Sequence, residues 1–483
     1  MSTDIKFIHT ADLHLGRPVS SGRKPPAGLK KIFSNAGYKA WKQICKLAID
    51  EEVEFILISG DLYDREARSV KASRIFTEQC KKLADEGIYV YVISGNHDPL
   101  GEAKEPFSAP ENVHFFSSEK VENILHKAVR DEISDKKMTG SFPAAEIMGQ
   151  SYRAKFESRK MYTYYTPDQD SHFNIGLLHT QLNPRNNRYV PISRQDLINK
   201  DDIDYWALGH IHEPRVLESS SPVISYPGIP QARTIEETGV KGCFLVELQS
   251  GSADNKCNIN FMPTSPVIFA RIEVDITENK FPGQSSHNHC EARPNSLQNL
   301  TDLQNLLNRK GEMFLQKDYR DRICFSGQEE IGACPSYGRK NLQGFVVRWL
   351  IKGRNSIHEL ISENQEEAEE ELIRQLNNYF AARGQKPFLW THSLHFRTNS
   401  ELPDKEEISN NEIYQEIEAI LADLRDNKNL RAELKDTWGE IWQGRLEKEE
   451  RRNDRFYPDK ETSEEILQAA HQQIIAHLFA GEN

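Results

Sequence analysis

Three short apolar runs, at residues 5–9, 55–58 and 89–93, each pass directly into a cluster of polar residues. The stretches between them, 37–52 and 68–86, carry apolar residues at the spacing of amphipathic helices. This alternation predicts a β-α-β-α-β unit with parallel strands. The carboxyl ends of such strands meet at one edge of the sheet, where open α/β folds bind their ligands. We therefore expect an α/β protein with a site built from strand-end residues.

The polar clusters are rich in carboxylates and imidazoles. They hold Asp12 and His14 after the first run, Asp61 and Asp64 after the second, and Asn96, His97 and Asp98 after the third. The side-chain period of two along a strand would point Asp12 and His14 to the same face. An Asp-x-His pair alone is more often a chance surface pair than a metal site. The prediction of a metal site therefore depends on further ligands elsewhere in the chain.

Two later strands supply more imidazoles. The run 174–178 leads into His179, and the run 205–208 leads into His210 and His212. Carboxylates combined with imidazoles suit Mn, Fe or Zn better than Mg or Ca, which prefer oxygen ligands alone. Two such cations about 3.5–4 Å apart can hold both the attacking and the leaving oxygen of a phosphate displacement. The pattern predicts a dinuclear metal site that hydrolyses phosphate esters.

Motifs in order along the chain resemble those of the calcineurin-like metallophosphoesterases. They are Asp12-x-His14, Gly60-Asp61-x-x-Asp64, Gly95-Asn96-His97-Asp98, His179 and Gly209-His210-x-His212. The opening Asp12–Gly16, the segment Tyr226–Gly228 and the strand Gly242–Val246 are similar to the SbcD-type (YhaO-like) DNA-repair nucleases. The resemblance implies a four-layer α-β-β-α sandwich over residues 1–263. It also implies a smaller α+β capping domain and a C-terminal helical region.

The resemblance further implies roles for individual residues. One metal would be held by Asp12, His14, Asp61 and His212, and the other by Asp61, Asn96, His179 and His210. His97 would protonate the leaving oxygen, and Asp64 would orient His97, although some archaeal nuclease relatives have a histidine at that position. Asp98 would fix the turn. The implied activity is that of a Mn²⁺-dependent DNA nuclease, an exonuclease or an endonuclease, acting in double-strand-break repair.

Length and charge bear on the choice between substrates. The chain has 483 residues, and a long region follows the catalytic domain. A phosphatase or a cyclic-nucleotide phosphodiesterase on the same metal site needs no such extension, although the sequence leaves that alternative open. A scaffold with a vestigial site should have lost a ligand, and none is missing. The net charge of −12 argues against a general nucleic-acid coat, but not against a nuclease with local basic patches.

The regions beyond residue 263 are expected to bind DNA and a partner protein. Residues 264–400 resemble in position the DNA-holding capping domain of SbcD-type nucleases, and residues 401–483 have the pattern of amphipathic helices. These helices would bind a coiled-coil SMC-like ATPase (SbcC/YhaN-type) or a second copy of this chain. No P-loop occurs, so ATP hydrolysis would come from the partner. The polar insertion 277–295 favours a mobile segment over a zinc site at His287, His289 and Cys290.

Residues 17–36 are expected to form a basic loop. Its cations, around Pro25-Pro26, are Arg17, Arg23, Lys24, Lys30 and Lys31. Such a loop would either guide a phosphate backbone into the site or be an ordinary solvated loop, and the sequence leaves both interpretations open.

Targeting and redox signals are absent from the sequence pattern. The chain has no apolar run long enough to span a membrane and no basic-apolar leader at its N-terminus. Its seven cysteines show no CxxC spacing. We therefore expect a reduced, cytoplasmic protein with no membrane partner.

Overall fold

The computed structural model of the chain describes most of its residues. The described ranges are 4–64, 69–100, 108–127, 144–168, 171–182, 188–250, 256–277, 297–323, 332–400 and 408–426, with single positions between 467 and 478. The predictions for the 278–295 part of the insertion, including His287, His289 and Cys290, and most of the amphipathic helices predicted within 401–483 lie outside these ranges. Within them, no helix is both long and apolar enough to cross a membrane.

The first sheet has seven strands in the order β14-β12-β11-β1-β2-β3-β4. Its parallel part is formed by β1, β2, β3 and β4, as the β-α-β-α-β pattern predicts. The strand β11 pairs antiparallel with β1 and continues the sheet on the other side. The bounds are Asp4–Thr10 (β1), Phe55–Ser59 (β2), Tyr89–Ile93 (β3), Val113–Phe115 (β4), Gly242–Gln249 (β11), Lys256–Pro263 (β12) and Gly332–Ala333 (β14).

The second sheet has six strands in the order β5-β6-β7-β8-β10-β9. Its central strands β6, β7, β8 and β10 are parallel, so their carboxyl ends also share one edge. The bounds are Glu122–His126 (β5), Ala145–Gly149 (β6), Asn174–His179 (β7), Tyr205–Gly209 (β8), Arg215–Glu218 (β9) and Val223–Tyr226 (β10).

The two sheets pack face to face through aromatic rings and one buried histidine. The Phe7 ring stacks on Phe55 at 5.0 Å and meets the edge of Tyr205, from the second sheet, at 5.3 Å. His9 on β1 contacts the Tyr205 hydroxyl at 3.0 Å and the Leu208 carbonyl oxygen at 3.2 Å. Burial lowers the pKa of His9 to about 3, so the ring is neutral and serves as a hydrogen-bonded link between the sheets. Sequence reasoning did not single out His9.

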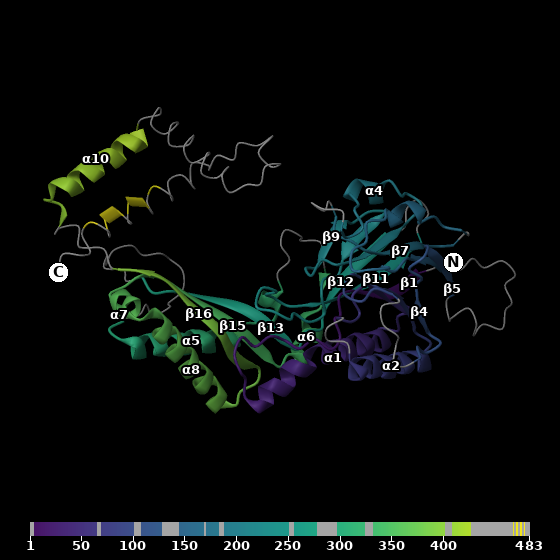
Figure 1. Ribbon diagram of the computed structural model, residues 1–483, viewed down its shortest axis with the longest axis horizontal. Coiled ribbons are helices and arrows are strands. Elements are labelled where there is room, and N and C mark those ends of the chain that lie inside the picture. Colours follow the sequence, from purple (N-terminus) through teal and green to yellow (C-terminus); the bar gives the residue numbers. More distant parts are fainter. Residues whose placement is uncertain are drawn as a thin grey trace. The chain divides into compact units, whose positions relative to one another are not determined.

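Helices cover the outer faces of this sandwich (Figure 1). The helices α1 (Ala27–Asp50) and α2 (Val70–Asp85) pack Trp41 and Phe76 against Ile56 and Val90 of the first sheet. The outer face of the second sheet is covered by the 3-10 helix Met161–Tyr164 and by α4 (Arg194–Ile198). The predicted four-layer sandwich is confirmed, although its second helical layer is thin.

The predicted basic loop 17–36 is wrong in its second half, because α1 begins at Ala27. The residues Leu29, Ile32, Phe33 and Ala36 fall at helical spacing and pack in one apolar cluster with Trp390. Pro26 occupies the N-cap with an extended backbone, at φ −60° and ψ 158°. The prolines and lysines of this stretch favoured a loop in the prediction. The apolar face of the helix start is short, and it forms a helix because it packs against the rest of the fold. Lys30 and Lys31 therefore lie on a helix.

By proximity of Cα atoms the chain divides into two compact units. One comprises residues 1–272, 308–349 and 373–394, and the other comprises 273–307, 350–372 and 395–483. Residues 264–400 contain both strands and helices, and three of these strands form one sheet in the order β13-β15-β16. The bounds are Val267–Asp275 (β13), Leu300–Gln316 (α5), Pro335–Asn341 (α6), Gly344–Arg354 (β15), Ile357–Glu363 (α7), Gln365–Arg383 (α8), Phe388–Asn399 (β16) and Glu412–Asp426 (α10).

The contact between the sheet edges can be tested at Gly209, the last residue of β8. A Cβ at this position would lie 1.8 Å from the Ser59 carbonyl oxygen. We expect Gly209→Ala to lower the free energy of unfolding by about 1–3 kcal/mol through overpacking. The matched control is Gly37→Ala in α1, where a Cβ meets nothing within 4 Å. This control should raise stability by about 0.5–1 kcal/mol. Urea denaturation measures both, and unchanged stability of Gly209→Ala would show that the contact relaxes freely.

Candidate metal centre

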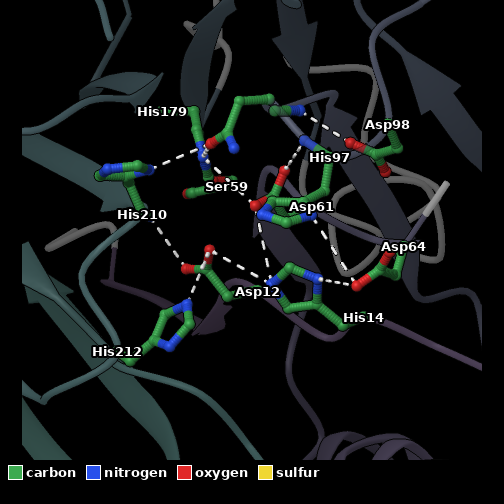
Figure 2. Close-up of polar contacts among 12 residues, drawn as sticks. Asp12, His14, Ser59, Asp61, Asp64, His97, Asp98, His179, His210 and His212 are labelled. Atoms are coloured by element: carbon green, nitrogen blue, oxygen red, sulfur yellow. Dashed lines mark hydrogen bonds and ion pairs between the residues drawn. The ribbon is translucent and has the colours of Figure 1, made fainter. Parts of the chain in front are cut away.

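The predicted site residues come together at the shared edge of the two sheets. Figure 2 shows Asp12, Asp61, His179, His210 and His212 turned toward a common centre, with His14, His97 and Asp64 beside it. Three overlapping groups have ligand atoms that all lie within 4.8 Å of one another. They are Asp12, His14 and His212; His14, Asp64 and His97; and Asp12, Asp61 and His179.

The backbone around the site differs from the predicted strand geometry. Strand β1 ends at Thr10, so strand alternation does not explain why Asp12 and His14 point together. Both residues instead have left-handed backbones, with φ of 52° and 43°, as do Asp61 at 51° and His210 at 98°. Such backbones cost about 1–3 kcal/mol each for residues other than glycine. The main chain that follows β2 holds the first two residues: the Asp12 N–H donates to the Gly60 carbonyl and the His14 N–H to the Asp61 carbonyl, both at 3.0 Å.

Asp61 lies at the middle of the cluster. Its Oδ1 accepts the His97 backbone N–H at 2.8 Å. Its Oδ2 lies 3.6 Å from Nε2 of His14 and 3.6 Å from Nε2 of His179. These distances are too long for hydrogen bonds, but they are in the range of roughly 3–4 Å that separates two ligands of one cation. Burial raises the pKa of Asp61, and the neighbouring His97 opposes that rise.

Asn96, His179 and His210 form a second group, in which the Asn96 oxygen faces one ring nitrogen of each histidine. The Asn96 Oδ1 lies 3.0 Å from Nε2 of His179 and 3.1 Å from Nδ1 of His210. Because the Nδ1 of His179 lies 2.9 Å from the Ser59 carbonyl, it carries the proton and leaves Nε2 as a lone pair. Burial lowers the pKa of His179 and lowers that of His210 to about 3, so both rings are neutral. The lone pairs of His179 Nε2 and Asn96 Oδ1 therefore face each other, an arrangement that a cation stabilises.

Asp12 and His14 carry buried polar atoms that lack hydrogen bonds. The Asp12 Oδ2 accepts the His210 backbone N–H at 2.9 Å, while Oδ1 lies 4.0 Å from Nε2 of both His14 and His212. In the described ranges, Asp12 Oδ1 and both ring nitrogens of His14 have no hydrogen-bond partner. Leaving such groups buried and unsatisfied costs about 1–3 kcal/mol each. A divalent cation fits Asp12 Oδ1 and Nε2 of His14, because it would supply the partner that these two atoms lack.

His97 and Asp64 lie next to His14 in the cluster. The His97 side chain is 38% exposed, and its Nδ1 lies 3.8 Å from Oδ2 of the buried Asp64. Asp64 also contacts the Arg17 guanidinium, so the first cation of the basic loop belongs to the site. Asp98 accepts backbone hydrogen bonds from Gly95 at 2.8 Å and Tyr63 at 3.0 Å, which fixes the turn that presents His97.

Sequence reasoning missed two residues of the site, Arg233 and Glu237. The Glu237 Oε1 lies 2.7 Å from Nδ1 of His212, and Oε2 accepts the Arg233 backbone N–H at 2.6 Å. Burial alone would raise the pKa of Glu237, but these hydrogen bonds outweigh it and lower the pKa to about 2. A carboxylate on the second nitrogen of a histidine fixes its tautomer and orientation. The signal in the sequence was an Arg and a Glu four positions apart, soon after Tyr226–Gly228.

The Arg233 side chain completes the cationic edge of the site. It is only 12% exposed, and its Nη1 lies 3.8 Å from Oδ2 of Asp64. Its Nη2 lies 3.5 Å from Nε2 of His212. A guanidinium held this close to the cluster favours an anion in the space beside it, which suits a phosphate group.

Two glycines of the motifs are explained by close approach to the centre. A Cβ at Gly95 would lie 2.3 Å from Oδ1 of Asp61, and a Cβ at Gly60 would lie 2.2 Å from Nδ1 of His179. Gly60 also has a φ of 98°, which other residues rarely adopt. Only glycine lets these strand ends pass so close to the gathered side chains.

The chain is similar to known metallophosphoesterases and nucleases. Residues 5–214 match the family described as calcineurin-like phosphoesterase. The chain is 38% identical over 282 residues to the uncharacterized metallophosphoesterase YhaO of Bacillus subtilis, covering 58% of this chain and 65% of the relative. It is 27% identical to the DNA double-strand break repair protein Mre11 of Archaeoglobus fulgidus, covering 48% of this chain and 52% of the relative.

A further relative is a subunit of the nuclease SbcCD of Bacillus subtilis, at 22% identity over 51% of this chain and 67% of the relative. The matched part of the chain thus spans about half to two thirds of the length of these proteins. The matched stretch 5–214 holds the strands from β1 to β8 and the predicted site residues from Asp12 to His212. Residues 5–214 of this chain therefore form a calcineurin-like metallophosphoesterase domain.

Proposed function

We propose that this protein is a metal-dependent phosphodiesterase that hydrolyses DNA in double-strand-break repair, as an exonuclease or an endonuclease. The observation that carries the proposal is the central position of Asp61, whose Oδ2 lies 3.6 Å from one histidine of each proposed ligand set. The names of the relatives from Archaeoglobus fulgidus and Bacillus subtilis, a double-strand break repair protein and a nuclease subunit, favour DNA as the substrate.

The ligands are proposed to form two sets that share Asp61. One set is Asp12, His14, Asp61 and His212, and the other is Asp61, Asn96, His179 and His210. The mixture of carboxylate and neutral imidazole favours Mn²⁺ over Mg²⁺. Two divalent cations supply charge neutralisation at the phosphate and acidify water, which is the chemistry that this hydrolysis needs.

His97 is proposed to donate the proton to the leaving oxygen. Its ring is 38% exposed and its centroid lies 4.8 Å from that of His14, so a phosphodiester at the cluster would be within its reach. Asp64, with Oδ2 3.8 Å from Nδ1 of His97, is a positioning residue that orients the ring. Arg17 and Arg233 both lie beside Asp64 and would hold phosphate oxygens. These residues supply binding charge, orientation and a proton at stated atoms.

The basic stretch and the capping region are proposed to extend the contact with DNA. Arg17 belongs to the site, whereas Lys30 and Lys31 lie on α1, so a track would run along the start of that helix. Residues 264–400 are proposed as the accessory DNA-binding domain. The test of the function is Mn²⁺-supplemented digestion of end-labelled single- and double-stranded DNA beside a small phosphodiester. Hydrolysis of the small ester without any cleavage of DNA would favour a phosphatase or a cyclic-nucleotide phosphodiesterase.

Asp61→Ala is expected to bind neither ion, because both ligand sets use this carboxylate. The matched control is Asp64→Asn, which alters another buried carboxylate of the same cluster but should retain both ions. Elemental analysis of the purified variants measures the metal content. Two ions retained in Asp61→Ala would rule out the bridging assignment.

His97→Ala is expected to keep its metal and its affinity for DNA while hydrolysis falls about 10²–10⁴-fold, the usual contribution of a positioned acid. The control His114→Ala removes a histidine of β4 that pairs with Glu122, outside the described cluster, and should cleave DNA at the wild-type rate. Initial rates of strand cleavage decide the matter. Activity of His97→Ala within a few-fold of wild type would remove it as the proton donor.

The C-terminal region 401–483 is proposed to bind a coiled-coil SMC-like ATPase or a second copy of this chain. Helix α10 supports this because Ile413 and Ile420, on one face, are 52% and 54% exposed. Changing both to Glu should abolish co-purification with the ATPase, or halve the mass seen by light scattering if the partner is a second copy. Ala422→Glu, on the opposite face, is the control. Intact complexes after the double change would contradict the proposal.

A further inference from the structure

A basic and aromatic segment lies beside the metal centre and is not used by the proposed chemistry. Residues 153–160 contain Arg153, Lys155, Phe156, Arg159 and Lys160 with a single acidic residue, in a chain whose net charge is −12. Phe156 is 52% exposed, more than any other phenylalanine of the described ranges. An exposed aromatic ring among cations is a combination that binds single-stranded nucleic acid.

Four rings in successive contact lead from the centre to the surface. The buried His179 lies 5.2 Å from His210 between ring centroids, and His210 lies 4.7 Å from Tyr189. Tyr189 in turn lies 6.2 Å from Phe156. Phe156 is therefore two ring contacts from a proposed metal ligand, so a strand lying over Tyr189 would reach both the centre and the Phe156 ring.

The main chain holds these rings in place. The Glu157 N–H donates to the Arg188 carbonyl at 2.9 Å, and the Val190 N–H donates to the Glu157 carbonyl at 2.7 Å. The Thr180 hydroxyl, next to His179, donates to the Val190 carbonyl at 2.8 Å. The segment that carries Phe156 is thereby tied to the strand end that supplies a ligand. A surface fixed before binding loses little conformational freedom when a base stacks on it.

Positive charge surrounds the exposed ring. The Arg188 guanidinium carbon lies 5.2 Å from the centroid of Phe156, and the Lys155 ammonium lies 5.9 Å from it. Both distances are within cation–π range. A nucleotide stacked on this ring would have its phosphate beside two cations, which is the pairing of stacking and charge that tracks a single strand.

We propose that Phe156, with Tyr189, Arg188 and Lys155, is a stacking platform for an unpaired base of single-stranded DNA that enters the metal centre past His210. This inference rests on the proposed DNA nuclease function and adds to it the form of substrate at the site. The faces of bases are free to stack on protein rings only where the strand is unpaired. The platform thus selects an unpaired nucleotide next to the bond to be cut.

The test compares an oligothymidine with an abasic strand of the same length, which has the same phosphates but no bases. Binding is measured by fluorescence anisotropy in EDTA so that no strand is cut. Phe156→Ala should weaken binding of the oligothymidine by about 5–150-fold, the range for loss of one base stack, and should lose the preference for bases. Phe156→Trp should retain it. Arg188→Ala should weaken binding of both strands.

The matched control is Tyr89→Ala, which removes another exposed aromatic residue, 41% exposed, at the start of β3 and so at the end of that strand away from the centre. It should bind both strands as wild type does. Wild type that cleaves DNA with Mn²⁺ while Phe156→Ala binds oligothymidine as tightly as wild type would overturn the platform alone. Wild type that binds and cleaves neither strand would overturn the proposed function and the platform with it.

Discussion

The metal centre brings hydrogen-bond acceptor atoms close together with no hydrogen atom between them. Asp12 Oδ1, Asp61 Oδ2, His14 Nε2 and His179 Nε2 are buried within 4.0 Å of their neighbours in this set. Such an arrangement is unfavourable without a counter-charge, and the chain accepts further cost in the left-handed backbones of Asp12, His14 and Asp61. The fold therefore leaves uncompensated negative charge and lone pairs at one edge of the sheets. Divalent cations fit this edge because they would compensate that charge, and the basic residues around Asp64 compensate part of it.

Much of this arrangement was predictable because it depends on strand ends. Apolar runs that stop at polar residues locate the edge of the sheet, and so the meeting of Asp61, Asn96 and His179 follows from sequence. The start of α1 was mispredicted because its apolar face is short, and the packing of that face with Trp390 cannot be read from the local sequence. Arg233 and Glu237 lie in a segment without periodicity, so no local pattern connects them to His212. The backbone of Asp12 and His14 was also beyond reach, because φ depends on hydrogen bonds to another part of the chain.

A chain with net negative charge can bind DNA if its basic residues are concentrated near the site. Arg17 and Arg233 are gathered against one buried carboxylate, Asp64, and the segment around Phe156 adds Lys155 and Arg188. Clefts of one sign can focus a field that the whole molecule does not have. Affinity for a polyanion would then be confined to the surface that leads to the centre, while acidic residues elsewhere discourage unproductive contact.

The proposed ligand sets draw on both sheets, since Asp12, Asp61 and Asn96 follow strands of the first, while His179 ends a strand of the second and His210 follows another. An ion shared by them would bind only while the sheets remain face to face. By linkage, its binding free energy would add to the free energy of unfolding. The bound ions would then hold the two sheets together, whereas the neutral His9 links the sheets without any ion. A shortage of metal would therefore lower the stability of the enzyme as well as its activity.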